Sequence, residues 1–114
     1  MINRTRQTVL VEQGWIADNL WSRMVGLLGR SGLEPGQGLL LKGEQAIHMF
    51  WMKFAIDVVY LDKQGRVLCA IDSLRPWRLG PYLRQASDVL ELPAGTCNAT
   101  QTRVGDELAF ELTT

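Results

Sequence analysis

Short apolar runs, each ended within a few residues by glycine, proline or a polar turn, are the feature that most restricts how this chain can fold. The runs are rich in branched and aromatic side chains, which favour strands. They cover residues 9–11, 15–17, 39–41, 66–72, 87–92 and 108–112. The pattern predicts a mainly β fold, a compact β sandwich or barrel with one or two short helices. The length of 114 residues predicts one domain over 1–114.

One stretch has a clear helical period. It follows Asp18, which is suited to cap a helix N-terminus, and its apolar residues recur at spacings of three and four. Gly26 and Gly29 limit this helix to roughly two or three turns. It is still expected to be the longest helix, because the segment 96–101 contains asparagine and threonine and predicts a single weak helical turn.

The central segment His48–Asp62 is strand-like and contains the only histidine. Such a length is unusual for a strand in a small domain, so we expect a bend or bulge near Ala55. A hairpin turn over Asp62–Gly65 should follow, with the glycine suited to positive φ. Lys53 and Asp57 lie inside this apolar stretch, and charged side chains are costly to bury without partners. The segment is therefore the best candidate for a site.

The balance of basic and acidic residues argues against partners that are attracted by a strong electrostatic field of the whole protein. Twelve basic and twelve acidic residues cancel, so the chain offers no bulk attraction for nucleic acid or an anionic membrane, although local patches are not excluded. No apolar run reaches the roughly 20 residues that span a bilayer, and no signal peptide is recognisable before Val9. We expect a cytoplasmic protein with no membrane span. Cys69 and Cys97 form no CxxC pair and should be small core residues.

Common cofactor motifs are missing from the sequence. No GxGxxG follows a strand and no GxxxxGK[ST] occurs, which weighs against the common dinucleotide and phosphate-loop proteins. One histidine and two distant cysteines do not supply a familiar zinc shell. We therefore expect no cofactor, no metal and no nucleic-acid partner, and the oligomeric state stays undetermined.

His48, Lys53 and Asp57 each have a structural and a functional interpretation. His48 is either a hydrogen-bonded core residue, which we favour, or a general base or anion ligand. Lys53 and Asp57 share one face of a regular strand and form either a structural ion pair or half of a polar pocket, unless a bend at Ala55 separates them. A nucleophilic triad of one cysteine with His48 and Asp57 has no support from the spacing.

The segment Arg75–Arg78, with Trp77 inside it, has the basic and aromatic character of a nucleic-acid patch. It is too short to carry affinity alone. We favour a loop that folds over the core with Trp77 as its anchor. Arg23, between Trp21 and Met24, is by default an arginine on a solvated helix face.

Several stretches, taken in order, are recognisable. They are residues 23–30, 38–40, 48–62, 65–67, 89–96 and 105–106. This series closely resembles the domain-of-unknown-function 192 family, also known as uncharacterised protein family 0127, over nearly the whole chain from Val9 to Phe110. The resemblance implies a small, mostly β domain and supplies no biochemical activity. The family often has proline where this chain has Ala55, which fits a bend there.

The polar positions of these motifs, together with two tryptophans, are the candidate ligand-binding residues. They are Arg23, His48, Lys53, Asp57, Glu91, Trp51 and Trp77. Our main hypothesis is a non-catalytic β domain with a polar pocket for a small or peptidic ligand, in which cations bind and the two carboxylates orient them. One alternative is a small hydrolase-like enzyme with His48 as base and Asp57 orienting it. The other is a structural or interaction module, which needs an exposed apolar patch.

Overall fold

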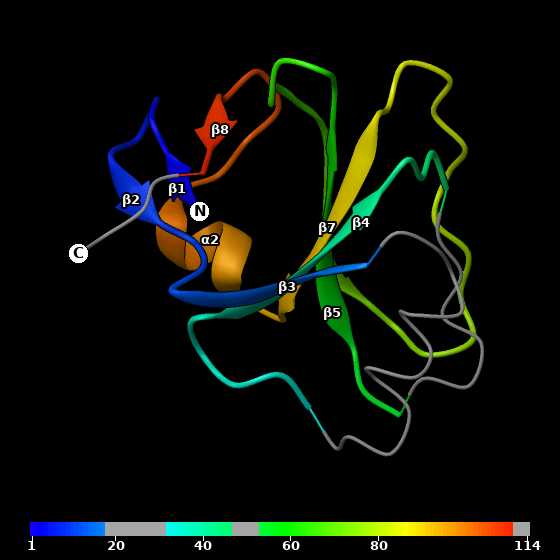
Figure 1. Ribbon diagram of the computed structural model, residues 1–114. Coiled ribbons are helices and arrows are strands. Elements are labelled where there is room, and N and C mark those ends of the chain that lie inside the picture. The colour runs from blue at the N-terminus through cyan, green and yellow to red at the C-terminus, as the bar shows by residue number, and fades with distance from the viewer. Residues whose placement is uncertain (18–31, 47–52, 111–114) are drawn as a thin grey trace.

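The computed structural model describes residues 1–17, 32–46 and 53–110, and within them the chain is mainly β (Figure 1). The strands are β1 (Ile2–Asn3), β2 (Thr8–Val9), β3 (Gln13–Ala17), β4 (Gln37–Lys42), β5 (Ile56–Leu61), β6 (Val67–Leu74), β7 (Asp88–Pro93) and β8 (Leu108–Ala109). The described ranges contain one short helix, α2 (Thr96–Thr100). The predicted fold class is thus confirmed. The helix expected after Asp18 lies outside the described residues.

The strands form two sheets. The large sheet has the order β3-β4-β7-β5-β6, and the small sheet has the order β2-β1-β8. All neighbouring strands are antiparallel except β3 and β4, which are parallel. In Figure 1 the small sheet and α2 lie together on one side of the large sheet. The described strands do not close into a barrel, because β3 and β6 form the two ends of the large sheet.

The core lies on both faces of the large sheet, and all six residues of β5 are buried. On one face Val59 and Leu90 pack with Cys97 of α2 and Leu108 of the small sheet. The other face carries a second cluster of buried residues: Leu39, Leu41, Ile56, Val58, Tyr60, Ala86 and Val89. Because both faces are covered, the central strands are apolar at nearly every position instead of alternating. No helix in the described ranges is long and apolar enough to cross a membrane.

The local predictions for the central segment hold in part. The backbone bends at Phe54 and β5 begins at Ile56, which agrees with the bend expected near Ala55, and residues 47–52 lie outside the described part. The hairpin turn is confirmed: the Oδ1 atom of Asp62 accepts the N–H groups of Gln64 and Arg66, each at 2.9 Å. Gly65 has φ +83°, and a Cβ at this position would collide with the backbone carbonyl oxygen of Leu108.

Candidate functional site

Asp57 is a fully buried carboxylate at the centre of the large sheet. Its Oδ1 atom accepts the N–H of Ser73 at 2.8 Å, and its Oδ2 atom accepts the N–H groups of Gly95 and Cys97 at 3.1 and 2.9 Å. All three donors are backbone groups, and within the described residues no cation lies within ion-pair distance of the carboxylate. The buried charge is therefore held by oriented N–H dipoles, which are charge-assisted donors.

A β-bulge in β6 supplies the first of these donors. The register of β5 against β6 shifts between Ile56 and Val58, so β6 has one residue more than β5 opposite Asp57. Ser73 takes φ +53° at this point, which is uncommon for a residue other than glycine. Its N–H turns to the carboxylate, and Asp72 stands beside it on β6.

The start of α2 supplies the other two donors. Gly95 is the N-cap of α2, with φ +95°, and as a glycine it has no side chain that could accept a hydrogen bond from the helix N–H groups. The first N–H groups of a helix have no intrahelical partner and need an acceptor. Asp57 provides that acceptor from a different strand, and its negative charge also suits the positive end of the helix dipole. One carboxylate thus joins the bulge of β6 to the beginning of α2.

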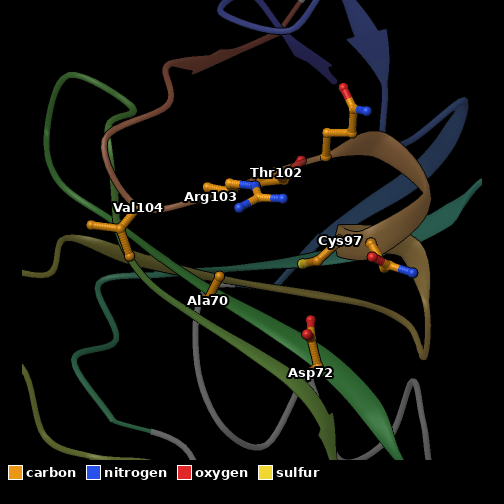
Figure 2. Close-up of a pocket in the computed structure, with 8 residues that line it drawn as sticks. Ala70, Asp72, Cys97, Thr102, Arg103 and Val104 are labelled. Atoms are coloured by element: carbon orange, nitrogen blue, oxygen red, sulfur yellow. The ribbon is translucent and has the colours of Figure 1, made fainter.

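A pocket of about 560 Å³ opens next to this junction, between β6, α2 and the segment that follows α2 (Figure 2). Asp72 points from β6 toward Cys97, and Arg103 extends from the segment after α2. The amides of Asn98 and Gln101 also line the space. Asp72 and Arg103 are exposed, and neither side chain forms an ion pair or hydrogen bond with a described residue. The pocket is therefore polar and holds one uncompensated charge of each sign.

Cys97 is a buried, neutral thiol on the inner side of the pocket. Burial, with the negative charges of Asp57 and Asp72, raises the pKa of the Cys97 thiol to about 12. The sulfur and the two carboxylates lie within 4.8 Å of one another, a spacing that metal ligands can have. A metal would have to ionise this thiol and compete for the oxygens of Asp57, which already accept N–H bonds. The donor set therefore fits a metal ion poorly.

Asp57 and Glu91 are both fully buried, but they point to opposite faces of the large sheet. Asp57 is paired with Leu92, whereas Glu91 is paired with Val58, the neighbour of Asp57 on β5. Paired residues of antiparallel strands share a face, and successive residues alternate between faces. The expectation that these two carboxylates would gather in one region is therefore wrong.

Lys53 does not pair with Asp57. Lys53 is exposed and precedes β5, so the strand periodicity that predicted a shared face does not apply to it. No ion pair joins these two described residues, so of the two alternatives the structural ion pair is not formed. The remaining predicted residues Arg23, His48 and Trp51 lie outside the described ranges, so the roles proposed for them stay predictions.

Trp77 is exposed and does not lie in the core. Its side chain is 56% exposed, and its backbone has φ +67°. The loop is held by Tyr60, a fully buried residue whose hydroxyl donates to the carbonyl of Pro81 at 2.7 Å. The expected burial of Trp77 is therefore not observed, and its role in holding the loop stays a prediction.

A third buried carboxylate, Asp106, was not predicted from the sequence. Its Oδ2 atom accepts from the Asn3 side chain at 3.0 Å, the Arg103 N–H at 3.0 Å and the Arg6 guanidinium at 3.1 Å. Burial opposes ionisation, but the hydrogen bonds from Asn3, Arg103 and Arg6 outweigh it and lower the pKa of the Asp106 carboxyl below its usual value. The available signal was the Gly105-Asp106 turn, which gives no hint of partners about a hundred positions away.

Comparison with known proteins points to one family. The model of the DUF192 family, described as "Uncharacterized ACR", matches residues 1–110. A UPF0127 protein of Thermococcus sibiricus is 30% identical over 98% of this chain and 75% of its own length. Another from Pyrococcus abyssi is 31% identical over 96% of both chains.

Two solved structures share the fold. A protein of unknown function from Novosphingobium aromaticivorans has a TM-score of 0.82 and 16% identity, and the match covers 96% of this chain and 81% of that one. A putative transcription regulator from Sinorhizobium meliloti has a TM-score of 0.70 and 24% identity, with coverage of 81% and 76%. At these identities the likeness concerns the fold alone.

Proposed function

We propose that this chain, which belongs to the domain-of-unknown-function 192 family, binds a small zwitterionic ligand in the pocket between β6 and α2. The observation that carries the proposal is the pair of unpaired charges, Asp72 and Arg103, in the wall of one pocket. A ligand with one cationic and one anionic group would compensate both. Amino acids and the ends of short peptides have this charge pattern.

The size and the remaining lining of the pocket support the same ligand class. A volume of about 560 Å³ lies within the range of ordinary small-molecule sites. Asn98 and Gln101 add amide donors and acceptors, which fix the orientation of a polar ligand. A guanidinium also binds a carboxylate in a bidentate manner, which gives geometric specificity.

Asp57 acts in this proposal as a positioning residue behind the pocket. Its hydrogen bonds hold Ser73, the neighbour of Asp72, and the start of α2, which carries Asn98. The polar pocket of the main sequence hypothesis is thus retained with a different set of charged residues. The hydrolase alternative requires Asp57 to orient a base, but within the described residues the carboxylate of Asp57 accepts only backbone N–H groups.

The test uses two-dimensional amide NMR on the full chain with glycine, glycylglycine, acetate and methylammonium as probes. Glycine or glycylglycine should shift the amide signals of Asn98, Gln101 and Arg103, and the two singly charged probes should shift them much less. Asp72→Asn and Arg103→Gln should each weaken binding about tenfold or more, since each removes a charged hydrogen-bonding partner.

Glu34→Gln and Arg66→Gln serve as matched controls, because both residues are exposed and lie outside the pocket. They should leave binding unchanged. Shifts that do not depend on Asp72 and Arg103, or no shifts with any probe, would count against a zwitterion site. The proposed location is the cytoplasm, as the sequence predicts, and fractionation of cells that express the chain tests it.

A further inference from the structure

The loop 75–84, which we call the arginine loop, combines exposed apolar and basic side chains. Its exposed apolar residues are Trp77, Leu79 and Tyr82, with 56%, 67% and 66% of their surface accessible. Its arginines Arg75, Arg78 and Arg84 are exposed as well. Single exposed apolar residues are ordinary, but three large ones within six positions of one loop are unusual for a surface that faces only water.

The arginine loop is held in place by hydrogen bonds from the body of the protein. Tyr60 donates its hydroxyl to the carbonyl of Pro81 at 2.7 Å. Gln45 donates its side-chain amide to the carbonyl of Arg84 at 2.7 Å, and its own carbonyl accepts the N–H of Leu83 at 2.8 Å. The loop therefore presents its apolar side chains from a supported backbone, and docking would cost little additional ordering.

The charged side chains of the arginine loop all have one sign. No acidic residue occurs between Ser73 and Ser87, so the three arginines give the segment a net charge of +3 although the whole chain is neutral. A loop that exposes both apolar and cationic side chains fits a partner that is apolar inside and negatively charged at its surface. The sequence-level argument from net charge does not apply to such a local patch.

We propose that the arginine loop docks onto a membrane surface that contains anionic phospholipid headgroups. Tryptophan and tyrosine are enriched at the headgroup level of membranes, and leucine favours the acyl region below it. Guanidinium groups bind phosphate in a bidentate manner. The binding is peripheral and reversible, because the patch is one loop with few apolar side chains. The proposal is independent of the ligand pocket, which lies between β6 and α2.

The experiment is sedimentation of the full chain with vesicles. Phosphatidylglycerol mixed with phosphatidylcholine should bind the protein, and phosphatidylcholine alone should bind it much more weakly. Replacement of Arg75, Arg78 and Arg84 by glutamine should lower the partition coefficient by roughly fivefold for each arginine removed. Trp77→Ser with Leu79→Ser should lower it as well, without changing its dependence on salt.

Two control variants separate the loop from general effects of charge and apolar surface. Arg4→Gln with Arg66→Gln removes exposed arginines elsewhere, and Val9→Ser removes an exposed apolar side chain elsewhere. Both should bind like the original chain, and circular dichroism should show that every variant is folded. Absence of binding to the anionic vesicles overturns the proposal. So does an equal loss in the control variants, or loop-dependent binding to polyglutamate without binding to vesicles, which would indicate an acidic protein partner instead.

Discussion

Asp57 and Asp106 are both buried carboxylates that accept three hydrogen bonds, yet they are satisfied in different ways. The donors to Asp57 are backbone N–H groups of a β-bulge and of a helix start. Two of the three donors to Asp106 are the side chains of Asn3 and Arg6, and Arg6 is 38% exposed. Asp57 therefore joins secondary-structure elements, whereas Asp106 ties the N-terminal strand to the turn before β8.

Because their donors differ, Asp57 and Asp106 should contribute differently to the free energy of unfolding. If Asp57 is lost, the three backbone N–H groups that donate to it lose their acceptor, and backbone groups cannot swing into water as a long side chain can. If Asp106 is lost, Arg6 can turn into water and Asn3 has a second partner in Thr102, at 3.2 Å. The network around Asp57 should therefore be the more sensitive of the two.

The largest effect is expected for Asp57→Asn. The amide removes the charge and places a donor against backbone N–H groups, so the free energy of unfolding should fall by roughly 3–5 kcal/mol. Urea denaturation measures it. Asp72→Asn is the matched control, since Asp72 is exposed and makes no hydrogen bond to a described residue, and it should change stability by less than about 0.5 kcal/mol. Equal midpoints for the two variants would show that the hydrogen bonds to Asp57 contribute no more to stability than an exposed carboxylate does.

Leu90→Ala and Val58→Ala provide an apolar reference on the two faces of the same sheet. Leu90 lies on the face that packs with α2, and Val58 lies on the other face. Each should cost about 2–4 kcal/mol, because both are large-to-small changes at buried positions. If the denaturant midpoints stay at the original value, these strands do not form the core. If Asp57→Asn lowers the free energy of unfolding by less than either change, Asp57 stabilises the fold less than an apolar core residue does.

Asp106→Asn should have a smaller effect, about 1–3 kcal/mol at neutral pH, from the loss of hydrogen bonds to a charged acceptor. The folded-state pKa of Asp106 is lowered, so the stability it contributes is present above its unfolded pKa of about 3.9 and is lost as pH falls through the folded value. Thermal melts at neutral and acidic pH should show a smaller acid loss in the variant. An identical acid loss in both proteins would mean that Asp106 does not contribute to it.

The smallest effect is expected for Arg6→Gln, about 0.2–1 kcal/mol, because ion pairs with a solvent-exposed partner contribute little. Added salt should reduce the difference from the original chain, since it screens the exposed charge. Denaturation at low and high salt checks this. A loss as large as that of Asp106→Asn would show that the guanidinium is the main donor to the carboxylate.

Elements with local causes were predictable from the sequence. The turn at Asp62–Gly65, the single helical turn that became α2 and the strand that became β7 all follow from the residues within them. Asp57 was also singled out, because an ionised group in an apolar run must find partners. Its donors were not predictable, since they lie 16, 38 and 40 positions away. The pocket residues Asp72 and Arg103 were missed for the same reason.

The sequence by itself determined where strands and turns occur and that Asp57 must be satisfied. Only the tertiary structure decided which groups satisfy Asp57, because strand register sets which side chains share a face of the sheet. The register of β5 against β7 pairs Asp57 with Leu92 and Val58 with Glu91, so the two carboxylates that looked like one cluster point apart. The extra residue in β6 then turns the N–H of Ser73 toward Asp57. Local preference gives the elements, and long-range pairing places their side chains.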